Sequence, residues 1–358
     1  QRCMAQVLNG LKDKVGFDPA DIEDVVAGCG TGSGDHAHDI ARMSVLDAGW
    51  PLSVTGVTLH RFCGSGQQAV NFAAMGVISG MQEAVVGGGV EFMSRYAPLH
   101  APGFHANNEH LFKLHPQVPQ GISADLIASI EGFSREDVDS YAVESQARAT
   151  LAIEEGRFKN ALVPIYNEDG SLALDRDEHP RPGTTLESME GLKPSFEAMG
   201  NHVMEGYAKT FDDMAKDRYP DVSEISHVHH AGNSSGVVDG AAALILSNKE
   251  YADKVGWKPR ARIRAMATVG GDPTLMLNEP VPAARKVLQR AGMTIDDIDL
   301  FEVNEAFSVV AAKFIRDLEL DPEKVNVNGG AMALGHPIAA TGSILIGTVP
   351  VSYTHLRA

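Results

Sequence analysis

The chain has 358 residues, of which 44% are hydrophobic and 22% are charged, a composition typical of a soluble globular protein. At roughly 150 residues per domain, this length predicts two domains. Lys and Arg number 30 against 47 Asp and Glu, a net charge of −17. This charge argues against a protein that binds nucleic acid or an anionic membrane surface, because such binders cluster Lys and Arg. No apolar run approaches the length of a membrane span.

The cysteines indicate a reducing compartment. Cys3, Cys29 and Cys63 are odd in number and have no C-x-x-C spacing, so they do not describe a disulfide framework. The first residues, QRCMAQVLNG, lack the basic-then-apolar arrangement of a signal peptide. We therefore predict a cytoplasmic enzyme with no nucleic-acid or membrane partner.

Short apolar segments alternate with helical patterns along the first part of the chain, which is typical of α/β proteins. From about Met93 to Val222 charged helical patterns and Pro-Gly turns replace the apolar runs, and we interpret this region as an inserted loop or lid domain. The segment 237–248 then returns to buried helix and strand character. The elements predicted in the first half are strands at 21–30, 53–62 and 83–92 and helices at 38–50 and 64–80.

A second α/β series is expected from Arg260 onward. Its glycine-rich turn, Leu334-Gly335-His336-Pro337, parallels Phe62-Cys63-Gly64-Ser65-Gly66 in the first half, which suggests an internal duplication. The elements predicted in this half are strands at 262–270, 298–304 and 325–330 and helices at 281–292 and 305–318.

Cys63 is the strongest candidate for a nucleophile. It follows a predicted strand and begins a helix through Gly-Ser-Gly, as in turns that display a reactive side chain. A helix N-terminus favours the thiolate and is expected to lower the pKa of a thiol, and nearby backbone N–H groups can stabilise an oxyanion. The alternative is that Cys63 is a small buried hydrophobic residue, as many lone cysteines are.

His336 is the candidate general base, because glycine and proline on its two sides describe a fixed loop and histidine exchanges protons near neutral pH. A purely structural histidine is the alternative. Asn304, in Asn304-Glu305-Ala306-Phe307, either caps a helix or orients a water or an oxyanion. The tract His227-Val228-His229-His230 resembles a metal site, but no matching Cys or carboxylate pattern accompanies it, so we expect no metal.

Six motifs together resemble the thiolase family, from about residue 5 to about residue 349. Each motif alone is weak, but their shared order and spacing make the combination specific. The motifs are FCGSGQQAV (62–70), VVGGGVEFMS (85–94), GNSSGVVDGAAA (232–243), ATVGGDP (267–273), EVNEAF (302–307) and NVNGGAMALGHPIAATG (326–342).

The resemblance implies acyl transfer on coenzyme A thioesters, with acyl-CoA and CoA as substrates and no separate cofactor. Thiolases cleave a 3-ketoacyl-CoA with CoA, or run the reverse Claisen condensation, through an acyl-thioester on cysteine. By this resemblance Cys63 is the nucleophile, His336 activates it and Asn304 holds a water in an oxyanion hole. Ser235 corresponds to the serine that binds the pantetheine arm, and Phe307 to a residue lining the acyl end of the pocket.

The family fold is a five-layered α/β/α/β/α arrangement of two related halves with an inserted loop domain, usually in homodimers or homotetramers. We accordingly predict an N-terminal half at 1–247, containing the insertion at about 93–222, and a C-terminal half at 248–349. Residues 350–358 are expected to be a non-native tail without helical period. The family's C-terminal C-x-G-G-G-x-G segment, which carries a second catalytic cysteine, is not found, so the chain is expected to be incomplete.

A second departure is Pro119-Gln120-Gly121, which stands where the family commonly has His-Met-Gly beside the CoA and acyl site. Two other functions stay open at this point. A non-catalytic thiolase-like binding subunit is disfavoured by the presence of Cys63 and His336. A related condensing enzyme usually pairs its cysteine with two histidines, or with His and Asn, and the NEAF, GHP and GNSSG motifs favour thiolase.

Overall fold

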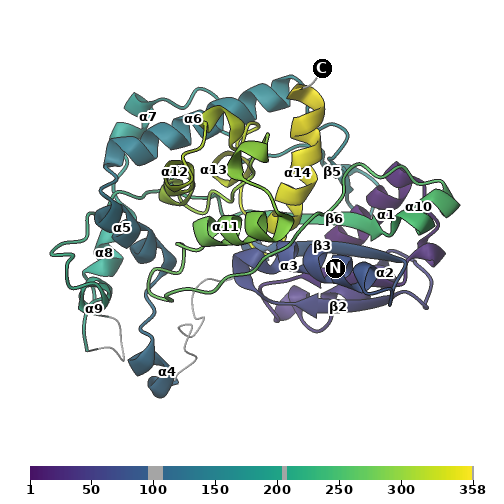
Figure 1. Cartoon of the computed structure of the whole chain (residues 1–358), viewed down its shortest axis with the longest axis horizontal. Helices are drawn as coiled ribbons and strands as arrows, with labels where there is room; N and C mark the ends of the chain where they lie inside the picture. Colours follow the sequence, from purple (N-terminus) through teal and green to yellow (C-terminus); the bar gives the residue numbers. More distant parts are fainter. Residues whose placement is uncertain (96–107, 204–207, 357–358) are drawn as a thin grey trace.

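A computed structural model describes residues 1–95, 108–203 and 208–356 (Figure 1). Its main sheet has four strands in the order β2-β1-β3-β6. Strand β1 (Asp24–Gly28) pairs in parallel with β2 (Thr55–Leu59) and with β3 (Ala84–Phe92), whereas β6 (Asp239–Ser247) is antiparallel to β3. The three strands predicted in the first half are therefore confirmed. The segment predicted to combine helix and strand at 237–248 forms only a strand.

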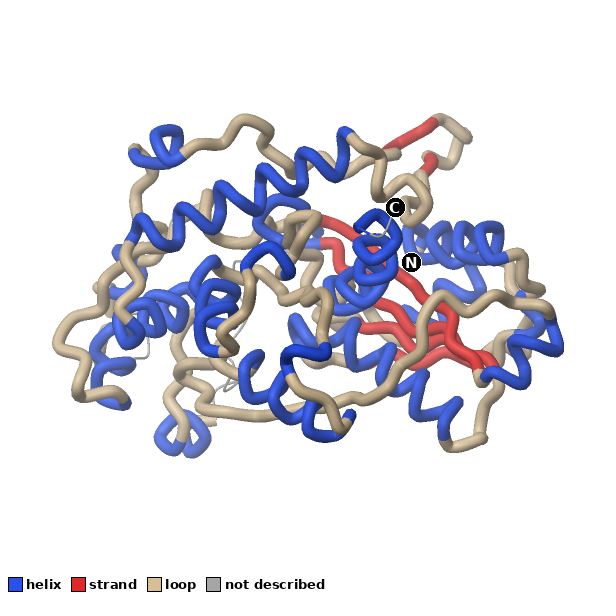
Figure 2. Tube along the Cα trace, turned by 45° about the horizontal axis from the view of Figure 1, so that its top comes forward, coloured by secondary structure: helices blue, strands red, loops and turns tan. Residues whose placement is uncertain are grey.

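Helices cover both faces of this sheet, as Figure 2 shows. Helices α1 (Arg2–Val15) and α2 (Ile40–Asp47) cover one face, and α3 (Ser65–Ile78) covers the other. Side chains alternate between the two faces along a strand. Val25 therefore packs in the α1 and α2 core, whereas its neighbour Val26 packs against α3.

The segment between β3 and β6 has helices as its main regular structure and lies beside the sheet and above it in Figure 1. Its only strands in the described residues are the short hairpin of β4 (Ile165–Tyr166) and β5 (Leu172–Leu174). Its helices are α4 (Glu109–Leu114), α5 (Gln120–Glu131), α6 (Arg135–Glu154), α7 (Leu186–Glu190), α8 (Glu197–Gly200) and α9 (Phe211–Arg218).

The second half contains helices but, among the described residues, no second sheet. The helices predicted at 281–292 and 305–318 form, but the strands predicted at 262–270, 298–304 and 325–330 do not. Only a parallel bridge between Phe301 and Val325 joins two of these segments. Two paired segments without further strands beside them leave their outer backbone groups without strand partners. Isolated pairs of strands are therefore only marginally stable. The helices are α10 (Lys249–Val255), α11 (Pro280–Ala291), α12 (Ser308–Asp317), α13 (Ala331–Leu334) and α14 (Thr341–Leu356).

Helix α14 corrects the expectation of no helical structure over 350–356, because it continues through Pro350 to Leu356, and the last two residues of the expected tail, 357–358, lie outside the described residues. Val351 is buried in a cluster with Ala152 and Phe158. Ser352 is also buried, and its hydroxyl accepts a hydrogen bond from Asn328 Nδ2 at 2.8 Å. These contacts hold the helix although a proline inside it removes one backbone donor.

Single turns of 3-10 helix punctuate the chain at Pro19–Asp21, Gly34–His36, Phe62–Gly64, Met93–Arg95, Ile295–Asp297 and Pro322–Lys324. None of the helices in the described residues is both long and apolar enough to cross a membrane.

Candidate active site

Cys63 lies in the 3-10 turn Phe62–Gly64, which leads directly into helix α3. The turn is strained at Phe62, whose φ of 45° falls in the left-handed region. The Ser65 hydroxyl stabilises it by accepting from Arg61 N at 2.8 Å and donating to the Phe62 carbonyl at 2.7 Å. The strand–turn–helix placement predicted for Cys63 is thus what the structure has.

Burial raises the pKa of the Cys63 thiol above its ordinary value, and the charge of Glu91 acts in the same direction. Hydrogen bonds from the Gln120 side chain and from the backbone of Cys63 lower it, but less than burial raises it. The expectation that the helix N-terminus lowers this pKa is therefore wrong in this structure, because removing the thiolate from water costs more than those bonds return. A base is needed to produce the thiolate.

Sequence reasoning missed Gln120 as a contact of Cys63. Gln120 is the first residue of α5, which belongs to the predicted insertion, and its side chain hydrogen-bonds the thiol. The departure at Pro119-Gln120-Gly121 was the available signal. A carboxamide donates and accepts hydrogen bonds, whereas methionine offers only a weak acceptor, so this exchange changes the polarity beside the nucleophile.

His336 is held as a neutral base. Its Nδ1 lies 2.6 Å from Thr341 Oγ, and the Thr341 hydroxyl donates its single proton to the Pro337 carbonyl at 3.1 Å. The Asn304 amide nitrogen, 3.4 Å from Nε2, can only donate, so Nε2 keeps its lone pair as acceptor and Nδ1 carries the imidazole proton toward Thr341. Burial lowers the pKa of His336 to about 4, so the ring is uncharged at neutral pH.

Asn304 lies against this lone pair, with its Nδ2 at 3.4 Å from His336 Nε2. Its Oδ1 is buried and has no hydrogen-bond partner among the described residues. A buried carbonyl oxygen of this kind is costly unless a donor reaches it. The residue can thus bind a further polar group, in agreement with an orienting role.

The neighbouring Glu305 holds the Asn304 segment in place through hydrogen bonds. Its buried carboxylate accepts from Ser145 Oγ at 2.7 Å, from Asn326 Nδ2 at 2.9 Å and from Met332 N at 3.2 Å. Burial raises the pKa of Glu305. Through these bonds Glu305, the neighbour of Asn304, is linked both to helix α6 and to the segment 326–332 that leads to His336. The bonds thereby limit the movement of Asn304 and His336.

Three of the sequence motifs meet at these residues through backbone hydrogen bonds. Ser235 N donates to the Ala306 carbonyl at 3.0 Å, and His336 N donates to the Gly236 carbonyl at 2.9 Å. Ser235 itself is half-buried beside the Asn304 segment. The loop after His336 also reaches α3, because a Cβ added to Gly66 would lie 2.8 Å from the Ala339 carbonyl.

Phe307 follows in the same segment and is buried. Its ring packs edge-to-face on Phe196, with centroids 5.8 Å apart, and on His229 at 5.4 Å. Phe196 also lies against Gly121, next to Gln120, where a Cβ would meet its ring at 2.2 Å. Aromatic side chains therefore connect Phe307 to the start of α5, where Gln120 contacts Cys63.

The histidine tract is paired with carboxylates. His227 lies between Asp125, 2.7 Å from Nδ1, and Asp212, 2.9 Å from Nε2. His229 Nδ1 is 2.7 Å from the second oxygen of Asp125. Burial lowers the pKa of His227, but the hydrogen bonds and charges of the two carboxylates outweigh it and raise the pKa to about 9. The tract joins α5, α9 and the loop that carries Ser235.

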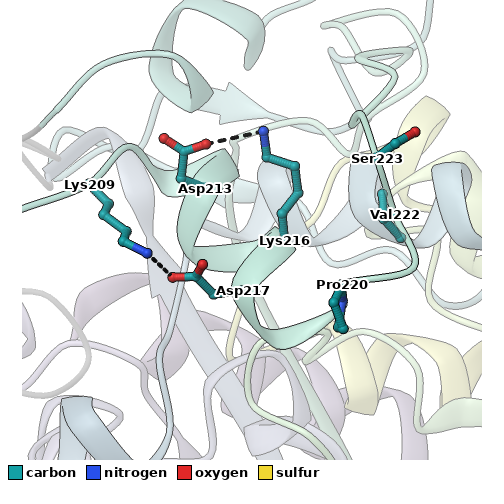
Figure 3. Close-up of a pocket in the computed structure, with 7 residues that line it drawn as sticks. All are labelled: Lys209, Asp213, Lys216, Asp217, Pro220, Val222 and Ser223. Atoms are coloured by element: carbon teal, nitrogen blue, oxygen red, sulfur yellow. Dashed lines mark hydrogen bonds and ion pairs between the residues drawn. The ribbon is translucent and has the colours of Figure 1, made fainter.

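A surface hollow with a volume of about 620 Å³ lies elsewhere, on α9 and the loop after it (Figure 3). Lys209 pairs with Asp217 at 2.6 Å and Lys216 with Asp213 at 3.1 Å. The lysines of this hollow are thus already neutralised. It contains none of the predicted site residues, which are Cys63, Asn304, His336, Ser235 and Phe307.

Comparison with known proteins decides the family. Residues 2–215 match the thiolase N-terminal domain and residues 257–354 match the thiolase C-terminal domain. The chain belongs to the thiolase family. The resemblance stated on six motifs is therefore confirmed, and so is the α/β fold class.

Curated thiolases match nearly the whole chain. A steroid 3-ketoacyl-CoA thiolase of Mycobacterium tuberculosis is 38% identical over 95% of this thiolase and 79% of its own length. A 3-ketoacyl-CoA thiolase of Aliivibrio fischeri is 36% identical, covering 96% and 84%. A 3-oxoadipyl-CoA/3-oxo-5,6-dehydrosuberyl-CoA thiolase of Escherichia coli is 40% identical, covering 92% and 80%.

Proposed function

We propose that this thiolase is an acyltransferase that cleaves 3-ketoacyl-CoA with CoA, and runs the reverse condensation, through an acyl-thioester on Cys63. The observation that carries the proposal is the state of His336. Its Nδ1 proton is committed to Thr341, burial keeps the ring neutral with a pKa of about 4, and the Nε2 lone pair lies beside Asn304. The relatives named as 3-ketoacyl-CoA thiolases support the same chemistry.

In the first half-reaction His336 Nε2 accepts the thiol proton of Cys63 while the sulfur bonds to the 3-keto carbon. The bond between C2 and C3 then breaks, which leaves an acyl group on sulfur, and C2 takes the proton that His336 accepted from the thiol, which releases the shorter acyl-CoA. In the second half-reaction the thiol of CoA takes the acyl group and Cys63 is restored. A neutral imidazole suits this cycle, because it accepts a proton in one step and returns it in another.

Charge develops on the substrate oxygen during each attack. After proton transfer His336 has an N–H at Nε2, and the amide of Asn304 lies 3.4 Å away. Donors fixed at this position before the reaction stabilise an oxyanion at little reorganisation cost. The buried Oδ1 of Asn304 is suited to accept from a water that donates its other proton to the same oxygen.

The binding roles are carried over from the family resemblance. Ser235, which is half-buried beside the Asn304 segment, corresponds to the serine that binds the pantetheine arm, and the buried Phe307 corresponds to a residue lining the acyl end of the site. The thiol and imidazole supply the nucleophile and base, so the reaction uses CoA as a substrate and needs no resident cofactor. All three cysteines are free thiols in the structure, which supports a cytoplasmic location.

A homo-oligomer is the proposed assembly. Strand β2 is an edge of the sheet, and Val57 on it is 47% exposed. On the adjacent helix α3, Phe72 and Met75 are 46% and 45% exposed. An apolar edge of this kind favours pairing with another chain. Light scattering after gel filtration tests the assembly, and a mass of one chain at micromolar concentration contradicts it.

The chemistry is tested by incubating the protein with acetyl-CoA and mapping the acetyl group by peptide mass spectrometry. We expect it on Cys63, and we expect no acetylation in Cys63→Ser. Thiolysis is then measured as loss of a 3-ketoacyl-CoA on addition of CoA. Acetylation of Cys3 or Cys29 in a folded sample, with Cys63 unmodified, contradicts the assignment of the nucleophile.

A further inference from the structure

The histidine tract at 227–230 leads directly into the loop that carries Ser235, and the acyl transfer proposed above gives the tract no role. The structure fastens the tract to two helices. Its first and third residues bond the carboxylate of Asp125 on α5, whereas His230 bonds that of Asp139 on α6. Asp139 and His230 are buried, with exposures of 5% and 1%. A hydrogen bond is electrostatically stronger in such surroundings than in water.

The imidazole of His230 has a fixed orientation. Its Nδ1 accepts from Gly232 N at 3.0 Å, so Nε2 carries the ring proton and donates to Asp139 Oδ1 at 2.8 Å. Burial lowers the pKa of His230, which keeps the ring neutral at neutral pH. A neutral imidazole has one donor and one acceptor, and both are used here. His230 therefore links the backbone of the loop to α6.

Asn233 makes a second link to the same carboxylate. Its Nδ2 donates to Asp139 Oδ1 at 2.7 Å and to the Val228 carbonyl at 3.0 Å, and its Oδ1 accepts from His230 N at 2.8 Å. The backbone carbonyl of Asn233 accepts from Ser308 N at 3.0 Å. The residue is 0% exposed, and both polar atoms of its side chain have partners, as burial requires. The loop is thus held between α6 and the start of α12.

Asp139 is itself held in place by a cation. Its second oxygen accepts from Arg135 Nε at 2.6 Å, one turn earlier on α6. The same guanidinium donates to the Met189 carbonyl at 2.9 Å and to the Leu192 carbonyl at 3.1 Å. A buried carboxylate needs such a partner to compensate the loss of water. The position of Asp139 is therefore set before any ligand reaches the loop.

Ser235 follows Asn233 by two residues, and its N donates to the Ala306 carbonyl at 3.0 Å. We propose that Asp139, acting through His230 and Asn233, is a positioning residue that fixes this loop in the geometry that binds the pantetheine arm of CoA and acyl-CoA. The inference rests on the proposed acyl transfer and adds a residue that none of its steps names. A loop that is already ordered loses little conformational entropy when its ligand binds. Removing the carboxylate should therefore weaken binding more than it slows the chemical step.

Two variants of Asp139 test this role. Asp139→Ala removes the acceptor, whereas Asp139→Asn keeps one oxygen that can accept from the loop. The dissociation constant of CoA is measured by isothermal titration calorimetry, and the rate of Cys63 acetylation is measured at saturating acetyl-CoA. We expect Asp139→Ala to raise the dissociation constant at least about tenfold, because the loop must then be ordered on binding, and to change the saturated rate far less. Asp139→Asn should recover most of the affinity.

Glu144→Ala is the matched control, because Glu144 is an exposed carboxylate of the same helix and pairs with Arg148. Equal dissociation constants for Asp139→Ala and Glu144→Ala overturn the inference, and so does a loss confined to the saturated rate. A wild-type protein that binds no CoA overturns the inference and the proposed acyl transfer together. One that binds CoA but is not acetylated at Cys63 overturns the acyl transfer alone.

Hydrogen exchange on the wild-type protein tests the inference even if the alanine variant does not fold. The backbone N of Asn233 donates to the His230 carbonyl at 3.1 Å, and that of Ser235 is bonded as described above. We expect both amides to exchange slowly in the protein without CoA. Rapid exchange at both positions, with protection only after CoA is added, would show that the ligand orders the loop and that Asp139 does not.

Discussion

The Nε2 atom of His336 and the side-chain amide nitrogen of Asn304 lie 3.4 Å apart, although 32 positions separate the two residues in the chain. In this contact the amide nitrogen donates and Nε2 accepts, and the imidazole proton is on the opposite nitrogen, Nδ1, beside Thr341. The basic nitrogen of His336 and the side-chain amide of Asn304 therefore lie at the same point of the site. The loop that follows His336 reaches the start of α3, the helix that Cys63 precedes.

Removing the imidazole tests its role as base. His336→Ala should slow acetylation of Cys63 by about 10²–10⁴-fold, the usual loss for a positioned general base. The protein is incubated with acetyl-CoA, samples are quenched at intervals, and the acetylated fraction is measured by intact-protein mass spectrometry. His110→Ala is the control, since His110 is exposed on α4. Equal rates for the two folded variants would make His336 structural.

Thr341 acts through His336 and is therefore a positioning residue. Thr341→Val keeps the shape but removes the acceptor for the Nδ1 proton, so the ring loses its fixed tautomer. We expect acetylation of Cys63 to slow by roughly 10–100-fold, the loss seen when a group that orients a metal-bound histidine is removed. Thr341→Ser retains the hydroxyl and should restore most of the rate. A Val variant as fast as wild type would show that Thr341 Oγ is not needed.

The polar contact of Gln120 predicts a change in thiol acidity. Its hydrogen bond lowers the pKa of Cys63 against the effect of burial, so Gln120→Met should move the pKa further up. Alkylation of Cys63 by iodoacetamide, followed across a pH series, measures this shift. The control is Gln289→Met, at an exposed position of α11. A midpoint that does not rise in Gln120→Met would contradict a direct bond to the thiol.

The sequence predicted the first-half sheet well, because β1 and β3 are continuous buried runs such as Val85-Val86. It failed at 298–304 and 325–330, which also contain apolar residues but where only Phe301 and Val325 are bridged. The local pattern of apolar residues indicates which residues are buried, whereas a strand also needs neighbouring strands for its backbone hydrogen bonds. The end of α14 was missed for the converse reason, since the burial of Ser352 comes from tertiary contacts.

The sequence motifs identified the candidate site residues, but they did not predict the pKa shifts and charge partners of those residues. Helix position alone suggested an acidic thiol at Cys63, yet burial raises its pKa, and two residues distant in sequence, Gln120 of α5 and Glu91 of β3, also act on it. The pairing of His227 with Asp125 and Asp212 could not be read from the tract itself. The partners of a charged group lie wherever the fold brings them.

The His227 pair predicts how stability depends on pH. The pKa of His227 is raised from 6.5 to about 9 in the folded protein. A raised pKa means that the folded state binds more protons between these values. The stabilisation is therefore complete below about pH 6.5 and is lost as the pH rises through about 9. In this window the free energy of unfolding should fall by up to about 1.4 kcal/mol per pH unit from this group.

His227→Gln should be less stable at pH 6.5 and should lack most of this fall. Urea denaturation at several pH values between 6.5 and 9.5 measures the slope for each protein. His230→Gln is the matched control, because His230 also pairs with a buried carboxylate, Asp139, but burial lowers its pKa. Its variant should keep the fall with rising pH. If His227→Gln and wild type show the same slope, the imidazole is not protonated between Asp125 and Asp212.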